Sequence, residues 1–413
     1  MVYQPPAGAR DLLPLDVAQK SWVEDRLQQV FHRWGYHQII TSTLERLDTL
    51  MAGGAIGRST VIRIDDAQEE LGLRPELTAS IARSAVTRMA KATYPVRLYY
   101  NANVFRRISD TDSYNRQLEF YQAGVELLGG GGWLADAEVL LLLAECLNQL
   151  SLNQWCLILG EAEIARSLLS PFPSDLQPQV REAIAHLDRV TLETLPLSDQ
   201  LRDRALSMLD LRGHPADVLQ KIANFDLDKS QQDALNRLKS LIELLDQSIT
   251  VSGNAKIPLI LDFSLLQTFD YYTGIVFEVV STQHQPRILG QGGRYDRLLA
   301  LYHPQAQNIP GIGFVLNIEE LQQVLASTNQ LPQVTPAIDW LVVPDSPQAY
   351  AAAFAYAEKL RNSSHLVRVE MDLGDRQPDA IRDYARRRCI GQIAWIKAEG
   401  LPVIDIIRNS PGL

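Results

Sequence analysis

The sequence contains few cysteines. There are three, Cys146, Cys156 and Cys389, and none of them belongs to a Cys-x-x-Cys pair or to a cluster with histidines. Disulfide-rich scaffolds and structural zinc sites both depend on such groupings. We therefore expect neither a disulfide framework nor a bound metal, and we interpret the three thiols as packing or surface residues.

Long apolar runs and an excess of basic charge are also missing. No stretch approaches about 18 uninterrupted apolar residues, and the start, Met-Val-Tyr-Gln-Pro-Pro, lacks the basic and apolar regions of a signal peptide. Lys and Arg number 39 against 49 Asp and Glu, a net charge of −10. Nucleic-acid binding draws its affinity from neutralised phosphates. We therefore expect a cytoplasmic protein with no membrane partner, and the composition disfavours tRNA binding.

The 413 residues are too many for one ordinary core and predict about two to four domains. Residues 1–330 mix strands and helices, and about 161–249 change to helical segments rich in Leu, Ala, Gln and charges, which indicates a helical insertion. Residues 331–336, which contain two prolines, form a linker. Residues 337–413 predict the order β-α-β-α-β-β, a small α/β domain without a basic face.

Two long strands are predicted at 96–104 and 118–128, joined by a polar loop. Gln122 and Glu126 lie four residues apart on the second strand and therefore share a face. An otherwise apolar strand thus presents a polar pair on one side.

A third strand is predicted at 275–280, immediately after the run Phe269-Asp-Tyr-Tyr-Thr-Gly274. A rigid strand would hold Tyr271 and Tyr272 in place to recognise a small ligand, although hairpin packing alone explains the run equally well. The glycines before Tyr295 allow the backbone to approach a ligand, or simply form a bend.

Glu76 and Thr78 are expected at the start of a helix, because Pro75 moves the preceding residue out of helical backbone space. Capping and helix-dipole effects explain both residues without any ligand. Their function therefore depends on what surrounds them.

Taken together, these segments resemble histidyl-tRNA synthetases. The matching segments, in family order, are Pro6 to Pro14, Arg74-Pro-Glu-Leu-Thr-Ala79, Phe105-Arg106, Gln122-x-Gly124-x-Glu126, Phe269-Asp-Tyr-Tyr-Thr-Gly274 and Gly292-Gly-Arg-Tyr-Asp296. The similarity covers essentially the whole chain. It implies an α+β fold of the class II aminoacyl-tRNA synthetase type: an antiparallel sheet with flanking helices, a helical insertion, a C-terminal α/β domain resembling an anticodon-binding domain, and a dimer.

The resemblance also implies a histidine site. Its candidate residues are Glu76, Thr78, Arg106, Gln122, Glu126, Tyr271 and Tyr272, with Gly292, Gly293 and Tyr295 nearby. Carboxylates suit an ammonium group and an imidazole N–H, while the tyrosines end an apolar wall. Three or four charge-assisted hydrogen bonds of about 1.5–3 kcal/mol each are enough for micromolar binding.

Several positions depart from the synthetase pattern, and four of them concern ATP or the activation step. Gln267 and Leu118 replace arginines, Ile108 replaces the glutamate that meets adenine, and Glu320 replaces the arginine that holds the ATP phosphates. A charge pair at 4 Å is worth about 4 kcal/mol at an effective dielectric near 20, so inverting a charge forfeits that attraction and adds a repulsion. We expect no catalysis and no cofactor.

An intact amino-acid site beside altered ATP positions is similar to the non-catalytic synthetase paralogues that serve as regulatory subunits of ATP phosphoribosyltransferase. That resemblance implies a hetero-oligomer with the short catalytic subunit, which depends on it for the first step of histidine biosynthesis, and feedback inhibition by free histidine. Two alternatives are an active histidyl-tRNA synthetase with unusual motifs and a synthetase-like RNA-binding module. Histidine-dependent ATP–pyrophosphate exchange tests for an active synthetase, and a gel shift with tRNA tests for an RNA-binding module.

Overall fold

The computed structural model describes residues 4–54, 56–66, 68–107, 117–252, 256–265, 271–283, 285–374 and 376–407. The chain divides into two compact units. The first comprises Met1–Leu13 and Gln19–Leu331, and the second Pro14–Ala18 and Pro332–Leu413. No helix among the described residues is long and apolar enough to cross a membrane.

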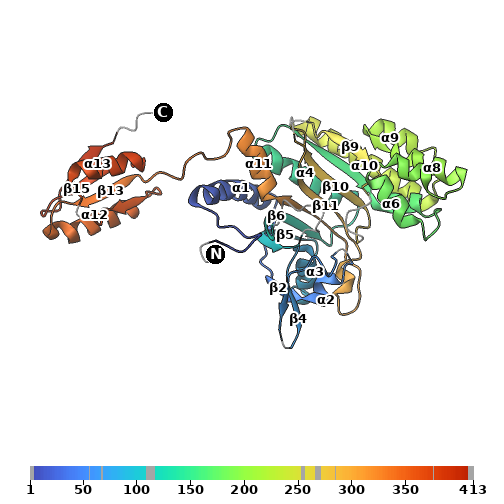
Figure 1. Ribbon diagram of the computed structural model, residues 1–413, viewed down its shortest axis with the longest axis horizontal. Helices are drawn as coiled ribbons and strands as arrows, with labels where there is room; N and C mark the ends of the chain where they lie inside the picture. The colour runs from blue at the N-terminus through green and yellow to red at the C-terminus, as the bar shows by residue number, and fades with distance from the viewer. Residues whose placement is uncertain are drawn as a thin grey trace. The chain divides into compact units, whose positions relative to one another are not determined.

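A nine-stranded sheet forms the centre of the first unit (Figure 1). Its strand order is β1-β5-β6-β12-β11-β10-β7-β9-β8. The strands are β1 His37–Gln38, β5 Val96–Phe105, β6 Glu119–Leu128, β7 Trp155–Glu161, β8 Arg212–Gly213, β9 Leu259–Asp262, β10 Ile275–Ser281, β11 Ile288–Arg294 and β12 Gly311–Asn317. Only the β1–β5 and β7–β9 pairs are parallel. The expected, mainly antiparallel sheet is therefore confirmed.

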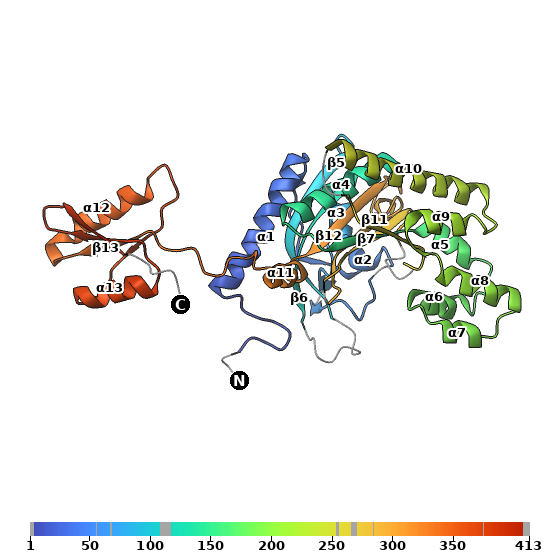
Figure 2. The ribbon, with the colours of Figure 1, turned by 90° about the horizontal axis from the view of Figure 1, so that it is seen from above.

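One face of this sheet is covered by α1 (Pro14–Arg33), α4 (Trp133–Gln149) and α11 (Ile318–Ser327) (Figure 2). The apolar stripe of α1 is buried at Val23, Leu27, Val30 and Phe31. Phe31 packs at ring-centroid distances of 5.3 Å from Tyr99 and 6.4 Å from Phe314. Because side chains alternate along a strand, the neighbours of Tyr99 face the opposite side.

That opposite face packs against α3 (Thr78–Thr87) and the short helix η1 (Leu299–Leu301). Beside α3 lie α2 (Leu47–Met51) and a separate sheet in the order β2-β4-β3, formed by Leu44–Arg46, Glu70–Leu73 and Arg63–Asp65. This core includes Leu98 and Tyr100 of β5 together with Ile81 of α3. The polar pair of β6 faces this side.

Helices fill the segment after β7, where the sequence predicts an insertion. They are α5 Ala162–Leu169, α6 Gln177–Ala185, α7 Arg189–Thr194, α8 Asp199–Leu209, α9 Pro215–Ile222 and α10 Lys229–Ser252. The side chains of Glu161, Asp188 and Ser198 cap α5, α7 and α8. Figure 2 shows these helices gathered at one end of the large sheet, which the chain rejoins briefly through β8.

The second unit contains a four-stranded sheet in the order β14-β13-β15-β16. Its elements are β13 Trp340–Pro344, η2 Pro347–Ala349, α12 Tyr350–Arg361, β14 Val369–Met371, α13 Pro378–Arg387, β15 Gln392–Ile396 and β16 Pro402–Ile406. β13 is parallel to β14 and β15, and only β16 is antiparallel. α12 and α13 cover opposite faces of the sheet, because Val342 packs in one apolar cluster and Leu341 in the other.

Candidate functional site

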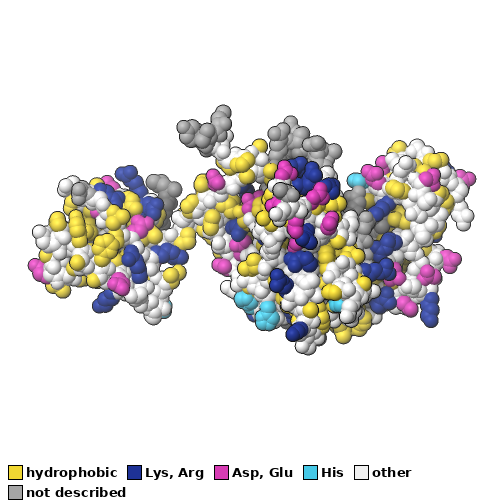
Figure 3. Space-filling view, turned by 90° about the horizontal axis from the view of Figure 1, so that it is seen from below, with side chains coloured by type: hydrophobic (Ala, Val, Ile, Leu, Met, Phe, Trp, Pro, Cys, Tyr) yellow, Lys and Arg dark blue, Asp and Glu magenta, His cyan; other side chains and the backbone are white. Residues whose placement is uncertain are grey.

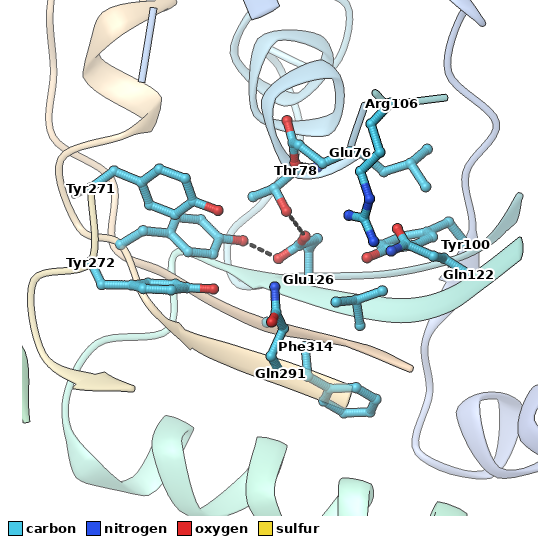
Figure 4. Close-up of a pocket in the computed structure, with 14 residues that line it drawn as sticks. Glu76, Thr78, Tyr100, Arg106, Gln122, Glu126, Tyr271, Tyr272, Gln291 and Phe314 are labelled. Atoms are coloured by element: carbon cyan, nitrogen blue, oxygen red, sulfur yellow. Dashed lines mark hydrogen bonds between the residues drawn. The ribbon is translucent and has the colours of Figure 1, made fainter. Parts of the chain in front are cut away.

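A small cavity lies between the start of α3 and the polar face of the large sheet (Figure 4). Its lining residues are Glu76, Leu77, Thr78, Tyr100, Arg106, Gln122, Glu126, Tyr271, Tyr272, Gln291, Tyr295, Gly313, Phe314 and Val315. Eight of the ten residues predicted from the sequence are therefore brought together. The volume is about 30 Å³, and about 10–15 Å³ of such space is enough to hold a water molecule.

Glu126 lies at the centre of this cavity and is only 2 % exposed. Its carboxylate accepts a hydrogen bond from the Thr78 hydroxyl at 2.7 Å (Figure 4). It accepts another from the Tyr295 hydroxyl. Burial raises the pKa of Glu126 to about 8, although both hydrogen bonds lower it. A cation that enters the cavity would favour the ionised carboxylate.

Glu76 has two roles in this arrangement. Its carboxylate accepts the backbone N–H groups of Thr78 (2.5 Å) and Ala79 (2.9 Å) and so caps α3. The same side chain lines the cavity, and burial raises its pKa. Thr78 does not use its hydroxyl for capping, because that group donates to Glu126. Capping therefore accounts for Glu76 but not for Thr78.

Arg106 provides the positive charge of the site. It follows β5, and its guanidinium points into the cavity (Figure 4), 4.8 Å from the ring centroid of Phe120. Burial lowers its pKa. Among the described residues, no acceptor is hydrogen-bonded to this guanidinium. Arg106 is thus a cation available to a carboxylate or another anion.

Three polar or close-packed positions in the cavity wall were missed from the sequence: Tyr100, Gln291 and Gly313. Tyr100 pairs with Gly124, and Gly313 pairs with Glu126, across neighbouring strands. A Cβ atom on Gly313 would lie 1.9 Å from Oε2 of Glu126. One sequence signal could have identified Gln291. It lies two residues before the predicted site residue Gly293, and residues two apart on a strand share a face.

Gly292 and Gly293 lie beside the cavity and do not form its wall. A Cβ on Gly293 would lie 2.8 Å from the Tyr272 ring, so this glycine makes room for that ring. A Cβ on Gly292 would lie 2.6 Å from Phe277, in the core on the opposite face. Both glycines support the site through packing.

The four altered catalytic positions have different outcomes. Gln267 and Ile108 lie outside the described residues. The half-buried Leu118 is held by its backbone, which donates to Gly8 (2.8 Å) and accepts from Arg106 (3.0 Å). Glu320 forms an ion pair with Arg287 at 2.8 Å. The acid at this position therefore neutralises a neighbouring arginine that could otherwise attract phosphate.

The raised pKa of Glu126 predicts how stability changes with pH. The ordinary pKa is 4.5 and the folded value is about 8, so the folded chain binds this proton more tightly than the unfolded chain. The free energy of unfolding should therefore fall as pH rises between these values, by on the order of a few kcal/mol from this group. Urea unfolding at pH 5.5 and 8 should show a smaller loss in Glu126→Gln than in wild type. An equal loss of unfolding free energy in wild type and in Glu126→Gln would contradict the raised pKa of Glu126.

Comparison with known proteins identifies the family and the fold. The histidyl-tRNA synthetase family model matches residues 8–321. A solved structure from Bacillus halodurans, described as an ATP phosphoribosyltransferase regulatory subunit/histidyl-tRNA synthetase, superposes with a TM-score of 0.79 at 26 % identity, covering 96 % of this chain and 99 % of that one. The histidyl-tRNA synthetase of Nostoc sp. PCC 7120 gives 0.77 at 18 % identity, covering 98 % and 97 %, and shows the shared fold.

Curated relatives distinguish between a regulatory subunit and a synthetase. The ATP phosphoribosyltransferase regulatory subunit of Nostoc punctiforme is 68 % identical over 410 residues, covering 99 % of this chain and 100 % of the relative. The regulatory subunit of Nostoc sp. PCC 7120 is 67 % identical over 407 residues, covering 98 % and 99 %. The synthetase of that same strain is far more distant. The chain belongs to the family of ATP phosphoribosyltransferase regulatory subunits. As a member of this family it is not itself catalytic, and the active-synthetase alternative is set aside.

Proposed function

We propose that this chain binds free histidine in the cavity around Glu126 and thereby regulates the short catalytic subunit of ATP phosphoribosyltransferase, which needs it for activity in the first step of histidine biosynthesis. One observation carries the proposal: eight of the predicted histidine-site residues converge on one cavity, while Glu320, at an altered ATP position, is paired with Arg287. The chemistry for an amino acid is present without the chemistry for its activation.

The charges of the cavity match the three polar groups of histidine. The carboxylates of Glu76 and Glu126 suit the ammonium group and an imidazole N–H, and Arg106 suits the α-carboxylate. Gln122 and the tyrosine hydroxyls supply further hydrogen bonds. Each charge-assisted bond contributes about 1.5–3 kcal/mol.

The small volume of the cavity provides a route to regulation. A volume of about 30 Å³ is small for an amino acid, so we expect lining side chains to move when histidine enters. Arg106 is the most suitable side chain to move, because its guanidinium has no hydrogen bond to a described residue that the movement would break. A ligand that favours one of two arrangements shifts the equilibrium between them, and the coupling to a bound partner is reciprocal.

The proposed assembly is a dimer of this chain joined to catalytic subunits in a hetero-oligomer, acting in the cytoplasm. Calorimetric titration of histidine, with and without the catalytic subunit, tests the sensing step. Binding should be on the order of micromolar, and the catalytic subunit should change the dissociation constant at least severalfold. If neither titration shows binding, the proposal is refuted.

Arg106→Ala gives a test of ligand orientation. If Arg106 meets the α-carboxylate, wild type should bind histidine much more tightly than histamine, which lacks that group. The substitution should weaken histidine binding by about 10- to 100-fold and leave histamine binding nearly unchanged. Calorimetry with both ligands measures the two effects.

The conservative variant Arg106→Lys serves as the control. A lysine keeps the charge but loses the planar fork of donors, so it should restore only part of the histidine affinity. Equal weakening of histidine and histamine in Arg106→Ala would place the carboxylate elsewhere.

A further inference from the structure

A second and larger cavity lies in the C-terminal unit. Its volume is about 610 Å³, within the range of about 300–1,000 Å³ for small-molecule sites. Its floor is formed where three parallel strands end, by Asp345 after β13, Asp372 after β14 and Trp395 of β15. Tyr350 and Phe354 of α12 form one wall. The histidine cavity shares none of these residues.

The strand order places this cavity where open α/β sheets bind ligands. From β13 the chain passes through α12 to β14 on one side, and then through α13 to β15 on the other side of β13. The order reverses between β13 and β15, with the two helices on opposite faces. A crevice therefore opens beyond the carboxyl ends of these strands, at the topological switch point.

Aromatic side chains line this crevice and remain open to it. Tyr350 is 50 % exposed and Phe354 is 54 % exposed, and they lie one helical turn apart on the same side of α12. Trp395 of β15 is half-buried, packs on the α13 side of the sheet and also lines the cavity. Figure 3 shows hydrophobic side chains gathered on the surface of this unit. Exposed rings around a crevice suit a planar ring, which they can stack against.

The charges favour an amine over a phosphate. No described residue donates a hydrogen bond to the carboxylate of Asp345. Asp372 is 7 % exposed and binds Arg376 through Oδ1, whereas no described residue donates to its Oδ2. Among the described residues that line the cavity, two carboxylates thus face one guanidinium, that of Arg376.

The helix starts at this edge are also poorly suited to anions. Pro347 and Pro378 stand in the first turns of η2 and α13. Proline has no backbone N–H, so each removes a donor that a phosphate at a helix start normally uses. The two carboxylates would repel a phosphorylated ligand, and the helix starts offer few backbone N–H donors to offset that repulsion.

We propose that this cavity binds a small molecule with a planar ring and an amine or similar cationic hydrogen-bond donor. The ring stacks against Tyr350 and Phe354, and the amine bonds to Asp345 and to the free oxygen of Asp372. This site is independent of the proposed histidine site.

Two probes with the same ring and opposite charge test the proposal on the full chain. Tryptamine and indole-3-acetate should be titrated by ligand-observed NMR, with circular dichroism to verify folding. Tryptamine should bind about tenfold more tightly than indole-3-acetate. Phe354→Ala and Asp345→Asn should each weaken tryptamine binding by about fivefold or more.

Two control variants distinguish this cavity from other sites. Leu366→Ala changes a residue of the same unit that is 81 % exposed and does not line the cavity, and Glu126→Gln changes the histidine cavity. Both should leave tryptamine binding unchanged. The proposal would be overturned if tryptamine did not bind, or if it bound with the same affinity as indole-3-acetate. It would also be overturned if Phe354→Ala kept full tryptamine affinity or if Glu126→Gln lost it. Displacement of tryptamine by a short oligoribonucleotide would overturn it as well.

Discussion

Glu126→Gln should weaken histidine binding on the order of 100-fold or more. The substitution keeps the shape of the side chain but removes the negative charge that this carboxylate takes when a cation binds at the centre of the cavity, where Glu126 is 2 % exposed. Without that charge, a bound ammonium or imidazole N–H loses a charge-assisted hydrogen bond and pays part of its desolvation uncompensated. Calorimetric titration of histidine into wild type and variant measures the effect.

Glu119→Gln is the matched control for this prediction. Glu119 lies on the same strand, β6, but outside the cavity, where its carboxylate accepts a hydrogen bond from Asn103 at 2.7 Å. Histidine affinity in this variant should stay within about twofold of wild type. Similar losses in both variants would mean that the effect arises from the stability of the strand and not from the site.

Gly313→Ala should destabilise the chain by about 3 kcal/mol or more and abolish histidine binding. The new Cβ would lie 1.9 Å from Oε2 of Glu126 and 2.4 Å from the backbone oxygen of Val125. Neither neighbour can yield easily, because Glu126 is held by two hydrogen bonds and Val125 belongs to the paired strand β6. Urea unfolding and histidine calorimetry measure the two losses.

Gly131→Ala is the corresponding glycine control. A Cβ at Gly131 would meet only Pro310, at 3.8 Å, which is ordinary contact, and its backbone is not in the left-handed region. Its free energy of unfolding should change by less than about 1 kcal/mol. If Gly313→Ala were equally mild, the cavity wall would be much looser than the strand register indicates.

The features that depend on local periodicity could be predicted from the sequence. Gln122 and Glu126 share a face because side chains alternate along a strand, and the structure places both in the cavity. The order of elements in the C-terminal unit follows from alternating apolar runs and turn residues. Neither conclusion requires knowledge of which strands are neighbours.

The features that depend on strand register could not be predicted in this way. Tyr100 reaches the cavity because β5 pairs with β6 opposite Gly124, and Gln291 does so because β11 lies next to β12. The ion pair between Glu320 and Arg287 joins two residues that lie 33 positions apart in the sequence. A sequence pattern identifies Glu320 as a charge reversal but does not reveal the arginine that balances it.

Glu76 shows a further limit of sequence reasoning. Capping and ligand binding are alternative explanations in the sequence, yet in the structure the carboxylate that caps α3 also lines the cavity. One carboxylate can therefore hold the helix start in place and remain available to a ligand. A substitution at Glu76 will change stability and binding together, which makes Glu126 the better residue for testing the site.

The most direct test of the central claim is the activity of a short ATP phosphoribosyltransferase catalytic subunit, measured alone and with this chain, with and without histidine. The wild-type chain should activate the catalytic subunit, and histidine should inhibit that complex. The complex with Glu126→Gln should remain active and resist histidine. Failure of the chain to activate, or equal inhibition of both complexes by histidine, would contradict the account.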